Sequence, residues 1–367
     1  LRMMVEDGVL SEGPAGWALS VDLDSIDVPQ TIQSLLATRI ERLPPPDRQV
    51  AELAAIVGAE FPFGALTAIA DDLTPTEVEH RLDRLRRREQ IQPTGAFWGE
   101  HPVYRFHHVL IRDAAYRRVL KGVRAELHPR VAAWLEDHAP ALADEVDVAV
   151  ATHLEQAFHY RQELDAPDPS LGRRAAQLFR RAADSALARD DLATTGALAA
   201  RAVDCLAHDD PELPELLLLA CESALSVGDV VTAERLLPWL DRRASGDARL
   251  EQWTACFRAQ LAVLTRPDGL TSAAREVDAA ADRLASLGDD AGVATARLIR
   301  AAALARLGMV GSCEVELDRA LGAARSAGDR RRITTVLAAA PVAALWGPSP
   351  VDRAGGRCLD VLRISRV

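Results

Sequence analysis

The second half of this 367-residue chain repeats itself at an interval of about 39 residues. The segment that starts at Ala182 (AADSALARDDLATTGALAARAV) aligns with the segment that starts at Ala220 (ACESALSVGDVVTAERLLPWL). Equivalent turns follow at this interval: Asp191, Asp229, Asp268, Met309 and Gly347. A repeat of this length corresponds to one pair of helices, which buries its apolar side only against the next pair. Such a repeat constrains the chain to a stack of helical hairpins.

Small side chains recur four residues after these turns: Thr195, Ala233, Ser272 and Cys313. A small residue there lets the second helix of a hairpin approach the first closely. The interval exceeds the roughly 34 residues of the tetratricopeptide repeat (TPR). We therefore expect four to five TPR-like hairpins with lengthened helices over residues 138–367, the fifth hairpin being the weakest.

Composition agrees with a helical protein, because aromatic residues make up only 4% of the chain and apolar residues 49%. The five cysteines include no CxxC pair and lie in Ala- and Leu-rich helical sequence, so we expect buried, reduced thiols in a cytoplasmic protein. No run of 18 apolar residues predicts a membrane span. The chain begins at Leu1 without an initiator methionine, and we interpret it as part of a longer protein.

Residues 29–137 have the pattern of a compact helical domain with a small β-hairpin. The Pro44–Pro46 run stops a first helix, Asp47 is expected to cap the second, and Thr74 followed by Pro75 is a strong start for another. Two short strands, around Ile91 and Tyr104–Phe106, are expected to flank a turn at Gly95. Three helices followed by a hairpin are typical of a winged helix. The predicted fold class is therefore all-α with a small β-hairpin wing: a winged-helix-like domain followed by a TPR-like α-solenoid.

Basic side chains concentrate between residues 74 and 135, where twelve Arg or Lys face seven Asp or Glu in a chain of net charge −11. Five arginines lie on the helix that would be the recognition helix of a DNA-binding winged helix: Arg81, Arg84, Arg86, Arg87 and Arg88. A basic helix there can enter a major groove. The acidic overall charge and the short wing instead favour contacts within the protein or a solvated face. Arg81, Arg84, Arg87 and Arg88 form the candidate basic contact surface, with nucleic acid the less favoured partner.

The sequence contains no complete catalytic motif. It lacks the GxxxxGKS/T phosphate loop, GxGxxG, HExxH, GxSxG and the EF-hand loop. His153 and His159 are six residues apart, which places them on different faces of a helix and argues against a metal site. We therefore assign no catalytic residue, no metal ligand and no cofactor to this chain.

Several strings, in this order, resemble large bacterial STAND-type ATPases. They are VPQTIQSLLATRIERLPPPDRQVAELAAIVGAEFPFGAL, YRFHHVLIRDAAYRRVL, RAELHPRVAAWLE and ATHLEQAFHYRQEL. The resemblance covers roughly residues 1–205 and extends to multidomain class III adenylate or guanylate cyclases and LuxR-type regulators. LRMMVEDGVL is similar to the last helix of the ATPase module, so residues 1–28 are expected to be a remnant of its lid.

The resemblance implies a non-catalytic regulatory and sensor fragment. ATP or ADP would bind an upstream module, and the winged helix over residues 29–137 would respond to the nucleotide. His108 of RFHHVL matches the FxH position at which related ATPases contact the nucleotide phosphates, although His107 stands where the family often has arginine. The competing interpretation is that His108 caps its own helix or packs under the wing. Arg112 and Asp113 are expected to form a structural pair.

The inner surface of the solenoid is the second candidate site. Stacked hairpins create a concave surface suited to a protein or a small-molecule effector. Trp239, Trp253 and Phe257 are candidate groove aromatics, with packing between helices as the competing interpretation. A different class of protein, a self-standing scaffold that binds a protein partner without nucleotide, would fit the same repeats.

We expect this chain alone to show no ATP turnover, because it has neither a phosphate loop nor an acidic Walker B strand. Phosphate release from ATP by the purified chain is the measurement. Release above the rate in buffer would contradict the assignment of a non-catalytic fragment.

Overall fold

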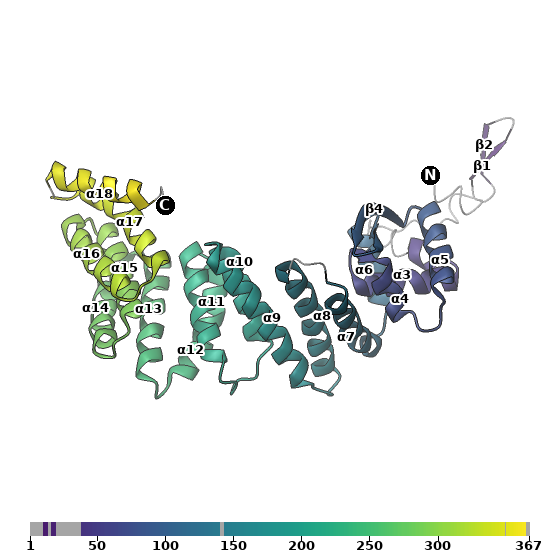
Figure 1. Ribbon diagram of the computed structural model, residues 1–367, viewed down its shortest axis with the longest axis horizontal. Helices are drawn as coiled ribbons and strands as arrows, with labels where there is room; N and C mark the ends of the chain where they lie inside the picture. Colours follow the sequence, from purple (N-terminus) through teal and green to yellow (C-terminus); the bar gives the residue numbers. More distant parts are fainter. Residues whose placement is uncertain (1–9, 14–15, 20–37, 140–142, 349, 365–367) are drawn as a thin grey trace. The chain divides into compact units, whose positions relative to one another are not determined.

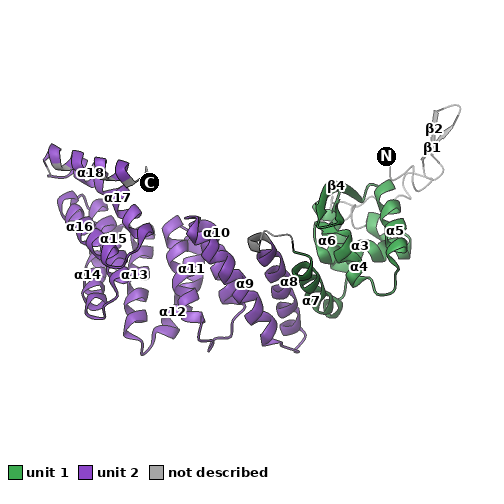
Figure 2. Cartoon of the chain, viewed as in Figure 1, with its two compact units in different colours: residues 1–140 green, residues 141–367 purple. Residues whose placement is uncertain are grey.

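The computed structural model describes residues 10–13, 16–19, 38–139, 143–348 and 350–364. The chain divides into two compact units, residues 1–140 and 141–367 (Figure 2). The expected lid remnant and the first helix of the expected winged helix lie mostly outside the described residues. Of the former, strands β1 (Leu10–Gly13) and β2 (Gly16–Leu19) are described, and they form an antiparallel hairpin.

Unit 1 has the winged-helix order of elements, helix–strand–helix–helix–strand–strand (Figure 1). The elements are α3 (Pro45–Val57), β3 (Glu60–Pro62), α4 (Phe63–Ile69), α5 (Pro75–Arg87), β4 (Ile91–Trp98), β5 (His101–Phe106), α6 (Val109–Arg118) and α7 (Lys121–Asp137). The predicted fold class, with its small wing, is therefore confirmed. Sequence analysis did not predict β3, whose three residues are too few to show an alternating pattern.

The starts of two helices in unit 1 differ in how well they were predicted. Helix α5 begins with a capping box: the Glu77 backbone N–H donates to the Thr74 hydroxyl at 3.3 Å, and the Thr74 N–H donates to the Glu77 carboxylate at 2.8 Å. The expected cap of α3 at Asp47 is wrong, because the N-cap is Pro44 and Asp47 lies buried in the first turn. Its carboxylate pairs with Arg84 of α5 instead of capping the helix.

The sheet of unit 1 has the strand order β3-β5-β4, with both pairings antiparallel. Phe61 of β3 packs against Phe106 of β5 with ring centroids 5.6 Å apart, which ties the sheet to the buried side chains of the helices. The wing is longer than expected and turns at Gly99 (φ 58°), not at Gly95. Gly95, at φ 80°, lies in an irregular stretch of β4 between Pro93 and Phe97.

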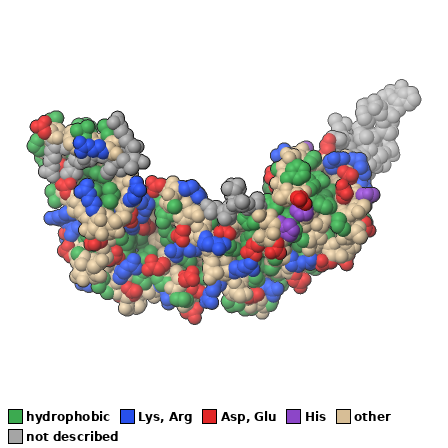
Figure 3. All heavy atoms as spheres, viewed as in Figure 1, with side chains coloured by type: hydrophobic (Ala, Val, Ile, Leu, Met, Phe, Trp, Pro, Cys, Tyr) green, Lys and Arg blue, Asp and Glu red, His purple; other side chains and the backbone are tan. Residues whose placement is uncertain are grey.

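Unit 2 consists of helices packed in chain order, α8 followed by five consecutive pairs (Figure 1). The helices are α8 (Ala143–Glu163), α9 (Pro169–Ala188), α10 (Leu192–Asp204), α11 (Leu213–Val227), α12 (Val230–Ala244), α13 (Ala248–Thr265), α14 (Leu270–Ser286), α15 (Asp290–Arg306), α16 (Val310–Ser326), α17 (Arg330–Trp346) and α18 (Val351–Ile364). The pairs α9/α10 to α17/α18 are the predicted hairpins. Basic and acidic side chains are interspersed over the face of unit 2 seen in Figure 3.

The turns of the hairpins follow the repeat, with one local shift. Asp191 caps α10 by accepting from the Thr194 N–H at 3.0 Å, and Asp229 caps α12 in the same way. In the third hairpin a 3-10 turn at Pro267–Gly269 moves the register by one residue. Ser272, expected to be the small contact residue, is therefore exposed, and Ala273 is buried instead.

Small residues set the distance between neighbouring helices. Gly172 of α9 has no room for a side chain, because a Cβ there would lie 2.3 Å from the Cys205 carbonyl oxygen and 2.8 Å from the Phe158 ring. Thr195, Ala233 and Cys313 are buried as expected.

Four of the five cysteines are buried in unit 2, and burial raises the pKa of the Cys205, Cys221 and Cys256 thiols to about 12. Cys358 is exposed, so the expectation of burial is wrong for this residue, which lies on the last helix. Within the described residues, no helix combines the length and the apolar character that crossing a bilayer requires.

Asp289 joins two successive hairpins. It caps α15 by accepting from the Gly292 N–H at 2.8 Å. It also accepts from the Trp253 indole N–H at 2.8 Å and from Arg249 Nε at 2.9 Å, both on α13. Burial would raise the pKa of Asp289, but these donors outweigh it and hold the pKa below its usual 3.8.

We expect Asp289→Ala to lower the free energy of unfolding by about 2–3 kcal/mol, because the change removes a cap and leaves a buried indole donor unpaired. Asp229→Ala is the control, since Asp229 caps α12 from an exposed position and should cost about 1 kcal/mol. Thermal and urea unfolding followed by circular dichroism are the measurements.

The loss of stability caused by Asp289→Ala should depend on pH. Because folding lowers the pKa of Asp289, its contribution is complete above the unfolded pKa of about 3.9 and is lost as the pH falls through the folded pKa. The difference in the free energy of unfolding between wild type and Asp289→Ala should therefore become smaller at acidic pH. Equal losses for the two variants, or a gap independent of pH, would contradict this role.

Candidate functional site

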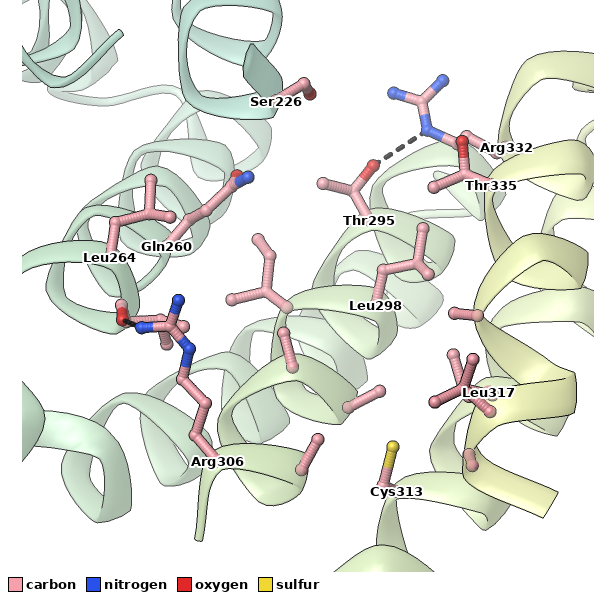
Figure 4. A pocket seen from close by; sticks show the side chains of 18 of the residues that line it. Ser226, Gln260, Leu264, Thr295, Leu298, Arg306, Cys313, Leu317, Arg332 and Thr335 are labelled. Atoms are coloured by element: carbon pink, nitrogen blue, oxygen red, sulfur yellow. Dashed lines mark hydrogen bonds between the residues drawn. The ribbon is translucent and has the colours of Figure 1, made fainter. Parts of the chain in front are cut away.

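A groove with a volume of about 830 Å³ lies in unit 2 and is lined mainly by the first helices of four successive hairpins. These are α11, α13, α15 and α17, with smaller contributions from α16 and from Leu192 of α10 (Figure 4). The repeat explains this arrangement, because equivalent helices of stacked hairpins lie on the same side of the stack. The binding site that the sequence predicted on the inner surface of the solenoid stays a prediction.

The floor of the groove is made of alanines. Ala302 and Ala305 of α15 and Ala339 of α17 line it and are exposed, whereas Ala343 lines it from a buried position. Because each of these side chains ends at Cβ, the backbones of α15 and α17 are accessible to an occupant. The depth of the groove therefore comes from the absence of larger side chains.

The walls of the groove are apolar. Leu264 comes from α13, Leu298 from α15 and Leu317 from α16. Val342 and Trp346 of α17 also line the groove and are 61% and 76% exposed. Large apolar side chains with this exposure next to a concave surface are typical of binding sites.

Polar groups gather at one end of the groove, where Figure 4 shows Thr295 and Arg332 facing each other. Arg332 Nε donates to the Thr295 hydroxyl at 2.8 Å. Arg331 Nη2 and Arg332 Nη2 both donate to Oε1 of Glu222 on α11, at 2.9 Å and 2.5 Å. An ion pair therefore joins the second hairpin to the fifth across 109 and 110 residues.

Arginines outnumber carboxylates among the residues that line the groove. Its lining includes Arg306, Arg331 and Arg332 but, among the described residues, Glu222 as the one carboxylate. Arg306 donates to the Val263 carbonyl near the other end. Burial lowers the pKa of Arg331, but the carboxylates of Glu222, Asp329 and Asp190 together outweigh this effect and the net shift is upward.

The candidate groove aromatics do not line the groove. Trp253 and Phe257 are buried with ring centroids 5.4 Å apart, and Trp239 packs on His208 at 4.5 Å. The alternative interpretation, packing, describes all three. Trp346, which does line the groove, was not predicted as a site residue. It follows Arg306 by 40 residues, so the repeat interval could have placed both on the same side.

Most of the arginine cluster on α5 contacts unit 1 itself. Arg84 binds the buried Asp47 carboxylate through Nε and Nη2, at 2.9 Å and 2.6 Å. Arg81 donates to the Pro46 carbonyl at 3.2 Å, and Arg86 pairs with Asp83 at 3.2 Å. Arg87 and Arg88 are exposed. The contact surface of Arg81, Arg84, Arg87 and Arg88 stays a prediction, with two of its members already bonded within the unit.

His108 lies at the N-cap of α6, directly after strand β5. Its Nδ1 accepts from the Leu110 backbone N–H at 3.1 Å, which is the capping arrangement considered in the sequence. Its role in sensing nucleotide stays a prediction. Arg112 and Asp113 form the expected pair at 3.2 Å, and Arg112 also donates to the Ala55 carbonyl at 3.0 Å, which joins α6 to α3.

No protein-family model and no curated protein matches this sequence. Among solved structures, the chain is similar to a STAND protein with a tetratricopeptide repeat sensor from Pyrococcus horikoshii, at 10% identity and a TM-score of 0.37. That match covers 93% of this chain and 55% of the other, so this chain spans about half its length. Aspartyl phosphate phosphatase F from Bacillus subtilis is matched at 11% identity and a TM-score of 0.38, over 93% of this chain and 86% of the other.

We expect Arg84→Gln to lower the free energy of unfolding by about 1–3 kcal/mol, because it leaves the buried Asp47 carboxylate without its bidentate partner. Arg87→Gln removes the same charge from an exposed position of the same helix and should change stability by less than about 0.5 kcal/mol. Thermal unfolding of the two variants is the measurement. Equal stability would contradict a structural role for Arg84.

Proposed function

We propose that this chain is a regulatory binding module whose TPR-like hairpins hold an apolar segment of a partner protein. The observation that carries the proposal is the 830 Å³ groove, which is lined by the first helices of four successive hairpins and floored by exposed alanines. A concave apolar site with a few convergent polar groups is the usual form of a binding site.

The chemistry of the groove favours binding over catalysis. Cys313 is the thiol that lines it, and burial raises its pKa, which disfavours the nucleophilic thiolate. Glu222 is held in ion pairs with Arg331 and Arg332, so its carboxylate is not free to act as a general base. The groove therefore supplies shape, apolar surface and charge.

The volume of the groove supports a second candidate, a small apolar effector. Pockets for small molecules commonly measure about 300–1,000 Å³, a range that includes this groove. We favour the protein segment because the lining extends along four helices, which suits an elongated occupant.

We further propose that the chain belongs to a STAND-type signalling ATPase, of the adenylate cyclase-like or LuxR-like kind, in which the winged helix couples binding to nucleotide state. The ordered strings of residues 1–205 support this proposal, and His108 is the residue assigned to the nucleotide phosphates. The complete open reading frame tests it. A phosphate loop encoded within about one large domain upstream would support it, and an initiator methionine directly before Leu1 would contradict it.

We expect Ala339→Trp to weaken binding in the groove strongly, because the new ring would fill the floor from a position where the side chain is exposed. The measurement uses a displayed library of 15-residue peptides selected on the wild-type chain. The selected peptides are then measured by fluorescence anisotropy on the variants, and Kd should rise at least tenfold.

Ala338→Trp is the matched control, because Ala338 is the neighbouring exposed alanine of α17 and does not line the groove. Its binding should equal that of the wild type. Peptides that bind both variants equally would contradict the proposed site. A wild-type chain that selects no peptide but binds 8-anilinonaphthalene-1-sulfonate in an Ala339-dependent way would favour the small effector.

A further inference from the structure

The strongest electrostatic feature of the groove is the convergence of two arginines on one carboxylate. Arg331 and Arg332 share Oε1 of Glu222, and the three side chains are 21%, 10% and 17% exposed. Arg332 is held by two further bonds, from Nε to Thr295 and from Nη1 to Asp329. These bonds fix the plane of its guanidinium group, so the position that Glu222 occupies is a preorganised carboxylate site.

The groove runs over α15, between α13 and α17. Helix α15 contacts both α13 and α17, and packed helices lie about 8–10 Å apart. A helix of a partner that lay over the alanines of α15 would contact α13 and α17 on either side by the same kind of packing. An amphipathic helix in an apolar groove is a recurring mode of peptide recognition.

We propose that the occupant is an amphipathic helix of a partner protein with an Asp or Glu at the end of its apolar face. The apolar face lies on the floor formed by Ala302, Ala305 and Ala339, and the acidic side chain replaces Glu222 on Arg331 and Arg332. This inference rests on the proposed function and adds the chemistry of the partner. The excess of arginine over carboxylate in the lining is the complementarity that selects an acidic helix.

Glu222 is therefore an internal competitor for the ligand carboxylate. This role predicts that two substitutions in the same ion pair change the affinity for an acidic helix in opposite directions. Glu222→Gln removes the competitor and strengthens the binding of an acidic helix, whereas Arg332→Gln removes a partner and weakens it. If Glu222 served only to hold α11 against α17, both changes would weaken binding.

The experiment begins with the peptides selected on the wild-type chain, and each acidic peptide is compared with the same peptide carrying Gln in place of its Glu. We expect the acidic form to bind the wild type about tenfold more tightly, the size of a charge-assisted hydrogen bond. Arg332→Gln should abolish this preference, and Glu222→Gln should lower the Kd of the acidic form about fivefold. The wild-type comparison needs no substitution in the protein, so it stands even where a variant is unstable.

Arg258→Gln is the charge control, because Arg258 is exposed on α13, pairs with Asp241 and does not line the groove. It should leave both affinities unchanged at constant ionic strength. Selected peptides without an acidic position, or weaker binding of the acidic form to Glu222→Gln, would overturn the inference while leaving the proposed function in place. Selection of no Ala339-dependent peptide would overturn both.

Discussion

The burial of small apolar side chains between consecutive hairpins is the constraint on which unit 2 depends. A single pair of helices has too little apolar surface to be stable alone, so each pair is stabilised by its neighbours. The contact residues are mostly alanines and leucines, and at Gly172 even a methyl group would collide with a carbonyl oxygen. Close packing of this kind fixes the direction of every helix, and it is why the first helices of four hairpins share one groove.

Capping and ion pairing secure the joints between hairpins. Asp289 ends one loop, begins α15 and receives the indole N–H of the preceding hairpin, so one carboxylate fixes three elements. Arginine suits such joints because its planar group binds two oxygens at once. The arginine-rich composition, which shows no function in the sequence alone, is thus largely used in pairs such as Arg84–Asp47 and Arg332–Glu222.

The hairpins and their turns could be predicted because the repeat and the caps are local. Asp191 and Asp229 lie where the spacing placed them, and Thr74 forms its capping box. Prediction failed where distant residues decide the outcome. Aspartate is a common N-cap residue, but Arg84, 37 residues later, pairs with Asp47 and holds it in the core. The 3-10 turn at Pro267–Gly269 shifted a register that the average interval could not resolve.

The groove shows the same contrast between features set by the repeat and features set by residues far apart in the sequence. The stacking of repeats predicts that equivalent helices lie on one side of the stack, whereas the pairing of Glu222 with Arg331 and Arg332 joins residues more than 100 positions apart and leaves no local pattern. The tryptophans also illustrate this limit, because composition does not distinguish Trp253, which is buried, from Trp346, which is exposed at the groove.

The exposed alanines of the floor have a consequence for how such a protein can diversify. Ala302, Ala305 and Ala339 line the groove from exposed positions, whereas other lining residues, such as Leu317 and Ala343, also belong to the buried core between hairpins. A change at one of these three alanines alters the shape of the groove without changing a buried contact between repeats. If the groove is the binding site that we propose, single codon changes there would give new specificities in a scaffold whose folding is left intact.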